Sequence, residues 1–270
     1  MVSLLHRPRT TLVPGPDGDL EVLTTGRGEP HTLFVHGLAG SISTTRPYAS
    51  AVAGTRSFVH LRGHGRSHVP ASPEWGYAEL AAEVRSVADR LGADRALGVS
   101  MGAGALLAGL AQDPGRFERL VLVLPAAVDR PRGDEAMRRL GRLAARVEAG
   151  DAGPVARHLL LEQPEQVRDD PHVVAWCREQ AEQLVSSGVA AALRVLPGRV
   201  PLADRSVLAR VTCPVLVLGQ EEDDTHPASV ACELAEALPA GSVHVAPPGG
   251  IMWEHRQQTR EIVGAFLSER

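Results

Sequence analysis

Short apolar runs rich in β-branched residues alternate along most of the chain with longer stretches that have helical periodicity. Thr32–Val35 and Arg95–Val99 have the length and composition of buried strands. In Tyr77–Leu91, apolar residues recur every three or four positions and leave charged side chains on the opposite face. Strands that alternate with helices in this way form parallel sheets covered by helices. The sequence therefore predicts an α/β fold with a mostly parallel central sheet flanked by helices.

The alternation stops in the middle of the chain. Segments there, such as Glu135–Glu148, have helical patterns interrupted by glycine and proline. The apolar run Pro214–Leu218 marks the return of strands. We therefore predict that residues 1–125 and 206–270 form the core and that residues 126–205 form a helical cap insertion.

Length and charge limit the classes of function. At 270 residues and 44% hydrophobic content, the chain can bury one large core. Its formal net charge of -4 comes without a dense basic patch, which argues against nucleic acid and is compatible with a small neutral or anionic substrate. No apolar run approaches the roughly 20 residues that span a bilayer, and the N-terminus lacks the apolar run of a signal peptide. These features predict a cytoplasmic protein with no membrane partner, and they leave its oligomeric state open.

The reactive residue types narrow the chemistry further. Cys177, Cys213 and Cys232 are widely spaced and odd in number, so they predict neither a disulfide framework nor a zinc site. No metal-ligand spacing and no glycine-rich phosphate motif appears, so we expect no cofactor. All 28 basic residues are arginine, which is typical of a GC-rich bacterial source. The absence of lysine excludes Schiff-base chemistry and a Ser–Lys dyad.

Residues 98–102 read GVSMG, a GxSxG motif between a predicted strand and a predicted helix. A serine on a tight strand-to-helix turn needs small neighbours, because larger side chains would collide with the adjoining elements. The helix that follows directs its N-terminal amides toward Ser100, where they can stabilise a developing oxyanion. This context makes Ser100 the predicted nucleophile.

Three further motifs follow predicted strands. They are FVHGL at residues 34–38, LRGHGRS at residues 61–67 and GQEEDDTHP at residues 219–227. Together with the GxSxG motif, and in this order, they give nearly the whole chain a resemblance to the α/β-hydrolase family. The resemblance implies a serine hydrolase with a variable cap that acts on an ester, thioester or lactone of a small molecule.

The resemblance also implies roles for single residues. It makes Ser100 the nucleophile and places the oxyanion hole at the backbone amides of Leu38 and Met101. The catalytic acid is Asp223, which lies four residues before the loop proline. A register error would select a neighbouring carboxylate instead, Glu222 or Asp224.

The chain departs from the family pattern at the histidine. The general base of the family normally follows the last strand, but the corresponding segment here reads PPGGIMW and places Ile251 at that position. Isoleucine cannot accept a proton from Ser100. We therefore predict an incomplete triad, with Ile251 filling the space between Ser100 and Asp223. Three other histidines are weaker candidates for the base: His255 one helical turn further on, His244 on the preceding strand and His226 in the acidic loop.

Two classes of function follow. The first is a serine hydrolase with weak or atypical turnover, in which an unusual base or a bound water carries the proton. The second is a non-hydrolytic member of the fold that binds, eliminates, rearranges or cyclises a small metabolite. Fold analogy favours the first class and the missing base favours the second. Cap residues that could line the substrate pocket are Trp176, Leu159, Leu160 and Leu161.

Overall fold

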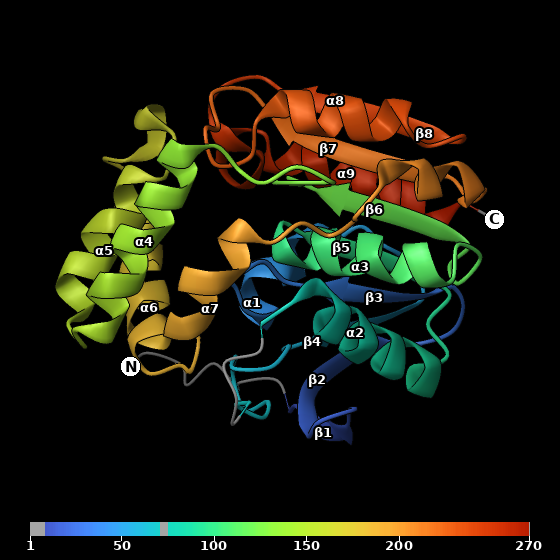
Figure 1. The fold of residues 1–270 in the computed structure, drawn as a ribbon, viewed down its shortest axis with the longest axis horizontal. Coiled ribbons are helices and arrows are strands. Elements are labelled where there is room, and N and C mark those ends of the chain that lie inside the picture. Colours follow the sequence, from blue (N-terminus) through green and yellow to red (C-terminus); the bar gives the residue numbers. More distant parts are fainter. Residues whose placement is uncertain (1–8, 71–74, 270) are drawn as a thin grey trace.

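A computed structural model describes residues 9–70 and 75–269. Eight strands in this part form one sheet in the order β1-β2-β4-β3-β5-β6-β7-β8 (Figure 1). The pairs β1–β2 and β2–β4 are antiparallel, and every other neighbouring pair is parallel. The predicted α/β class with a mostly parallel sheet is confirmed. The strands are β1 (Thr11–Pro14), β2 (Asp19–Gly26), β3 (His31–Val35), β4 (Thr55–Val59), β5 (Arg95–Val99), β6 (Arg119–Val123), β7 (Val215–Gln220) and β8 (Gly241–Ala246).

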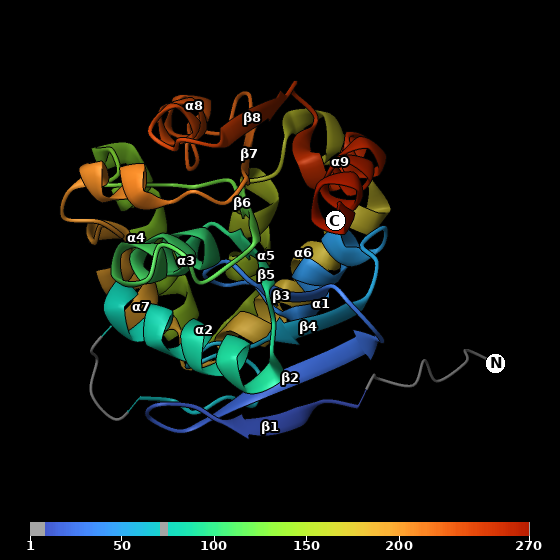
Figure 2. The same cartoon turned by 90° about the vertical axis from the view of Figure 1, so that its right-hand side faces the viewer.

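Helices cover both faces of the sheet (Figure 2). One face packs against α2 (Tyr77–Leu91), α3 (Met101–Gln112) and α8 (Ala228–Glu236). The other face packs against α1 (Ile42–Thr45) and α9 (Arg256–Ser268). Short 3₁₀ helices lie at Arg46–Ala49, Glu165–Val167, Leu196–Gly198 and Arg205–Arg210, and a π-helical turn lies at Gly250–Glu254.

Strand β3 shows how the sequence divides the core between these faces. Leu33 and Val35 belong to the apolar cluster on the side of α2 and α3. Phe34 points the other way and stacks on Phe58, with 4.9 Å between the ring centroids. Successive side chains of a strand point to opposite faces, so a continuous apolar run is what a strand buried on both faces requires.

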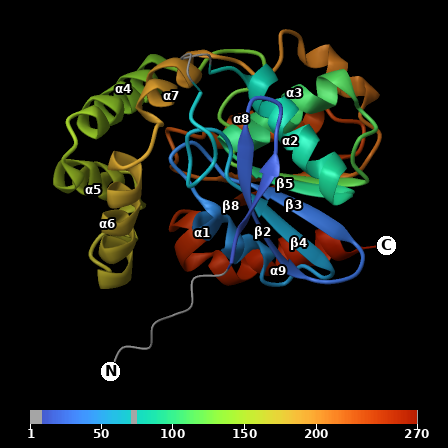
Figure 3. The ribbon, with the colours of Figure 1, turned by 90° about the horizontal axis from the view of Figure 1, so that it is seen from below.

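A helical insertion separates β6 from β7 in the sequence. Its helices α4 to α7 lie together beyond one end of the sheet (Figures 1 and 3). They share an apolar cluster of their own, to which Trp75 and the partly buried Leu38 of the core also belong. The predicted helical insertion is confirmed, whereas its limits at residues 126 and 205 stay a prediction. Its helices are α4 (Asp134–Glu148), α5 (Ala152–Leu161), α6 (Pro171–Val185) and α7 (Ala190–Val195).

The structure bears on only part of the predictions about membrane spans and a signal peptide. None of the helices in the described ranges combines the length and apolar character needed to cross a membrane. Residues 1–8, which carry much of the segment judged to lack a signal peptide, lie outside the described residues. All three cysteines lie within them and are free thiols.

Close packing of β5, α3 and β3 requires glycine at two positions of the GxSxG motif. A Cβ at Gly98 would lie 2.5 Å from the carbonyl carbon of Gly102. A Cβ at Gly102 would lie 2.5 Å from the carbonyl oxygen of Val35. Both distances are far below van der Waals contact, and both neighbours are backbone atoms that cannot rotate away. The two glycines therefore allow α3 to begin directly against the sheet.

We expect Gly102→Ala to lower the free energy of unfolding by about 1–3 kcal/mol, because the added methyl group overpacks a backbone contact. Gly109→Ala in the same helix is the matched control, since its Cβ would meet only the Cβ of Ala81, at 3.9 Å. That control should stabilise the protein by up to about 1 kcal/mol through alanine's higher helix propensity. Urea unfolding of both variants checks the contrast, and equal effects would contradict it.

Candidate active site

Ser100 lies between the last residue of β5 and the first residue of α3. Its backbone has φ 48° and ψ -101°, a positive φ that is unusual for a residue with a side chain. Such strain costs on the order of 1–3 kcal/mol and persists only where the surrounding structure enforces it. Here the Ser100 amide donates to the carbonyl of Val123 at 2.9 Å, and its carbonyl accepts from the amide of Gly104 at 3.0 Å. The serine is thus fixed at the carboxyl end of the sheet.

The acidic loop between β7 and α8 reaches the same end of the sheet. Within it, one oxygen of Asp223 (Oδ1) accepts from the amides of Thr225 at 3.0 Å and His226 at 2.9 Å. The other oxygen (Oδ2) lies 3.0 Å from Nδ1 of His226. The aspartate therefore closes a tight turn and orients the imidazole three residues further along.

His226 also reaches Ser100. Its Nε2 lies 2.9 Å from the Ser100 hydroxyl oxygen. Because the ionised Asp223 carboxylate only accepts hydrogen bonds, Nδ1 of His226 carries the proton and donates it. Nε2 is then free to accept the hydrogen bond from the Ser100 hydroxyl. The arrangement is a continuous hydrogen-bonded series from Asp223 through His226 to Ser100.

The expectation that no histidine would join Ser100 to the acidic loop is wrong. The imidazole of His226 occupies the space that was predicted to hold Ile251. Ile251 is instead 2% exposed and packs in the apolar cluster on the α9 side of the sheet, while its amide donates to the Gln220 side chain at 2.9 Å. His255, another of the three candidate bases, donates from Nε2 to the carbonyl of Pro248 at 2.9 Å.

The sequence did contain a signal for His226. An aspartate followed three residues later by a histidine can bond the ring of that histidine through its own turn. The search for the base after the last strand passed over this local spacing. The neighbouring carboxylates that the sequence left open make other contacts: Glu222 is exposed, and Asp224 faces Arg139 at 3.5 Å.

The Asp223 carboxyl stays ionised although it is largely buried. Burial by itself raises the pKa of this group, because a charge is poorly solvated there. The electrostatic interaction with the His226 ring and the hydrogen bonds from His226 and Thr225 outweigh burial and hold the pKa of Asp223 below its ordinary value. The carboxylate is therefore available to favour a positive charge on His226.

Of the two amides predicted for the oxyanion hole, one is next to Ser100 in sequence and the other belongs to a loop that passes close to Ser100 in space. Met101 follows it as the first residue of α3, and the loop carrying Leu38 passes so close that a Cβ on Gly37 would lie 3.4 Å from the Ser100 Cβ. Among the residues that the structure describes, neither amide donates a hydrogen bond to another protein group. Both are free to bind a ligand oxygen.

Buried histidines fix the loop that carries Leu38. Nε2 of His36 accepts from the amide of Leu61 at 3.1 Å, and Nδ1 donates to the carbonyl of Gly37 at 2.7 Å. Burial, and then the neighbouring His64 and His60, hold the pKa of His36 well below its ordinary value. A neutral ring with one donor and one acceptor suits these two contacts, so His36 has a structural role beside the site.

A cavity of about 300 Å³ lies over Ser100 and His226 and beneath the insertion. Leu159 and Trp176 line it as predicted, whereas Leu161 is exposed and Leu160 packs beside Val173 and Cys177. No cluster of metal-ligating side chains occurs within residues 9–70 and 75–269. Most of the lining is apolar, and the polar members on the insertion side are Arg132, Arg139, His158, Glu162, Gln163 and Gln180.

Comparisons with known proteins identify the family and the fold of the chain. A sequence model of the "Alpha/beta hydrolase family" matches residues 32–262. A protein named "Putative carbamate hydrolase RutD", from Variovorax paradoxus, is 30% identical over 235 residues, which cover 81% of this chain and 83% of that protein. A thermophilic esterase from Thermogutta terrifontis has a similar structure, with a TM-score of 0.76, 23% identity, and coverage of 94% of this chain and 96% of that one. The enol-lactonase from Burkholderia xenovorans LB400 has a TM-score of 0.79, 20% identity, and coverage of 96% and 100% respectively.

Proposed function

Because the chain belongs to the alpha/beta hydrolase family, we propose that it is a serine hydrolase for esters, thioesters or lactones of small molecules. The observation that carries this proposal is the position of His226, 2.9 Å from the Ser100 hydroxyl and 3.0 Å from Asp223. A base in this position removes the serine proton as the oxygen attacks, which a neutral alcohol by itself does poorly.

Each residue then has a defined step. His226 accepts the Ser100 proton through Nε2 while the serine oxygen bonds to the substrate carbonyl carbon. The amides of Leu38 and Met101 stabilise the negative oxygen of the tetrahedral intermediate. When the intermediate collapses, His226 gives the proton to the leaving alcohol or thiol. Water then attacks the acyl-serine, with His226 again acting as the base, and Asp223 remains ionised throughout.

The position of His226 also bears on the expected turnover. Weak hydrolysis and a non-hydrolytic role were both inferred from a missing base. With His226 hydrogen-bonded to Ser100, that reason no longer holds, and we propose ordinary turnover by a complete triad. The similar proteins include one named an esterase and one named an enol-lactonase. These names support a substrate with an electrophilic carbonyl carbon that Ser100 can attack.

The cavity supports a small and largely apolar substrate. Its volume of about 300 Å³ is at the lower end of the range for small-molecule sites. Trp176, Trp253, Met252 and Leu159 give it apolar walls near Ser100. An acyl or alcohol group of a few carbons would bury its apolar surface against these side chains.

We expect Ser100→Ala and His226→Gln each to lower kcat for p-nitrophenyl acetate by about 10³-fold or more, because the nucleophile and its base act as one unit. For the same reason, the double variant should be no slower than either single variant. Stopped-flow or plate-reader assays of nitrophenolate release measure these rates. His255→Gln is the control and should retain the wild-type rate, since the His255 imidazole bonds to the carbonyl of Pro248 and, within the described residues, has no hydrogen bond to Ser100 or Asp223. Wild-type activity in His226→Gln would refute the assigned base.

Replacing Ile251, which occupies the usual histidine position, is a second test of the assignment of His226 as the base. Ile251→His should not raise the rate of ester hydrolysis, because His226 already serves Ser100. It should lower the free energy of unfolding by about 1–3 kcal/mol, since it places a polar ring in an apolar cluster. Ile251→Val, the control, removes one buried methylene at a cost of about 0.5–1.5 kcal/mol. A clear gain in rate with Ile251→His would show that the site lacks an effective base.

A further inference from the structure

One four-residue segment, residues 223–226, carries both Asp223 and His226, and we name it the acid–base loop. Ser100 lies on a different part of the chain, at the junction of β5 and α3. The distance between the Ser100 oxygen and the His226 ring therefore depends on where this whole loop lies. A displacement of about 1 Å in a catalytic group can cost about 10²-fold in rate.

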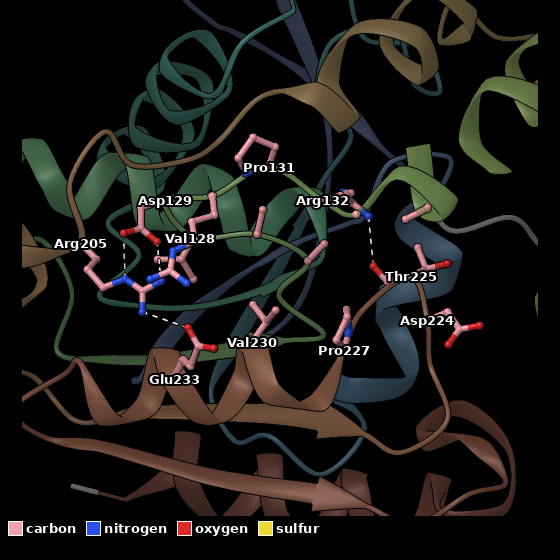
Figure 4. Close-up of a pocket in the computed structure, with 15 residues that line it drawn as sticks. Val128, Asp129, Pro131, Arg132, Arg205, Asp224, Thr225, Pro227, Val230 and Glu233 are labelled. Atoms are coloured by element: carbon pink, nitrogen blue, oxygen red, sulfur yellow. Dashed lines mark hydrogen bonds and ion pairs between the residues drawn. The ribbon is translucent and has the colours of Figure 1, made fainter. Parts of the chain in front are cut away.

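Cavities border the acid–base loop on several sides. The cavity over Ser100 is lined by Asp223, Thr225 and His226. A second cavity, of about 150 Å³, lies behind the loop, between α8 and the connection from β6 to α4 (Figure 4). A third cavity of about 180 Å³ is lined by residues 220–225 and by part of the insertion. Packing therefore holds the loop weakly, and its position must come from specific polar contacts.

We propose that three residues at the insertion side, Arg132, Arg139 and Glu162, are positioning residues that hold the acid–base loop so that His226 meets Ser100. The proposal rests on the proposed hydrolase function. It makes the insertion a part of the catalytic apparatus in addition to a wall of the substrate cavity.

Glu162 contacts the residue directly before His226. The hydroxyl of Thr225 donates to the Glu162 carboxylate at 3.3 Å. Glu162 is the C-cap residue that follows α5, and its backbone is held by the hydrogen bond from its amide to the carbonyl of His158 at 3.2 Å. This contact links the loop to the insertion on the side of the substrate cavity.

Arg139 extends the contact to a second loop residue. Its Nε lies 3.4 Å from one carboxylate oxygen of Glu162, and its Nη1 lies 3.5 Å from the carboxylate of Asp224. The Arg139 and Glu162 side chains are 27% and 26% exposed, so water screens their interaction less than it screens a surface ion pair, whereas Asp224 is 80% exposed and its pair with Arg139 is screened more strongly. Arg139 thus joins helices α4 and α5 to the loop.

Arg132 holds the loop from behind. Figure 4 shows its side chain directed at Thr225, where Nη1 donates to the backbone carbonyl at 3.3 Å. Arg132 borders both the cavity over Ser100 and the cavity behind the loop. The two arginines and Glu162 therefore contact Thr225 and Asp224, the residues between the acid and the base.

The matched variants Arg139→Gln and Arg138→Gln test the proposal. Arg138 is the preceding residue of α4 and pairs with Glu135 on the exposed surface, away from the loop. For p-nitrophenyl acetate, we expect Arg139→Gln to lower kcat about tenfold with KM changed less than about twofold, because the loss is one of alignment. Arg138→Gln should keep the wild-type kcat.

Three further variants separate positioning from other roles. Glu162→Gln should lower kcat by a factor similar to that of Arg139→Gln, and the double variant should lose less than the product of the two single effects, because the Arg139–Glu162 ion pair couples the two contacts with the loop. Arg139→Lys should restore part of the lost kcat. Thermal unfolding of each variant checks that the fold is intact.

The outcomes are distinct. Equal kcat in Arg139→Gln and Arg138→Gln overturns the proposal while leaving the hydrolase function standing. A loss in kcat/KM that appears entirely as a higher KM also overturns it, because Arg139 would then contact the substrate. A wild-type protein that hydrolyses no activated ester overturns the proposed function itself, and this inference with it.

Discussion

The hydrogen bonds that Asp223 makes within its own turn determine how the acid and the base of the site are oriented. One carboxylate oxygen accepts two backbone amides of the turn, and the other accepts the ring of His226. The aspartate thus shapes the loop and orients the imidazole at the same time. Because both tasks fall to one side chain, the orientation of the ring within the loop needs no contribution from a more distant segment.

The sheet supplies the other half of that geometry. Parallel strands bring their carboxyl ends to one edge, so the turn after β5 and the loop after β7 meet there although more than 120 residues separate Ser100 from His226. The positive φ of Ser100 is enforced by the close approach of α3 to the sheet, which Gly98 and Gly102 permit. The favourable free energy of core packing therefore offsets the backbone strain at Ser100.

Local patterns predicted the fold well because they depend on neighbours in sequence. The limits of α2 agree with those expected from apolar periodicity, and those of β5 agree with those expected from length and composition. Strand β1 was not predicted, since its four residues are mostly exposed and show no regular alternation. The site was harder to predict: the turn of Asp223 is a local feature, but the meeting of His226 with Ser100 depends on the relative placement of distant segments. The family pattern places the histidine at the position of Ile251, and for that reason the three-residue spacing from Asp223 to His226 was not recognised.

Placing the base in the acidic loop changes what the segment after β8 can do. This segment does not have to hold a catalytic histidine and provide its hydrogen-bond partners. Instead, Ile251 packs in the apolar cluster, and Met252 and Trp253 line the cavity. Trp253 also meets the insertion, through an edge contact with Trp176 at 5.5 Å between ring centroids and a 2.9 Å hydrogen bond from its indole nitrogen to Gln163. This segment therefore lines the cavity over Ser100 and anchors the insertion, while the proposed proton transfer belongs to the acid–base loop.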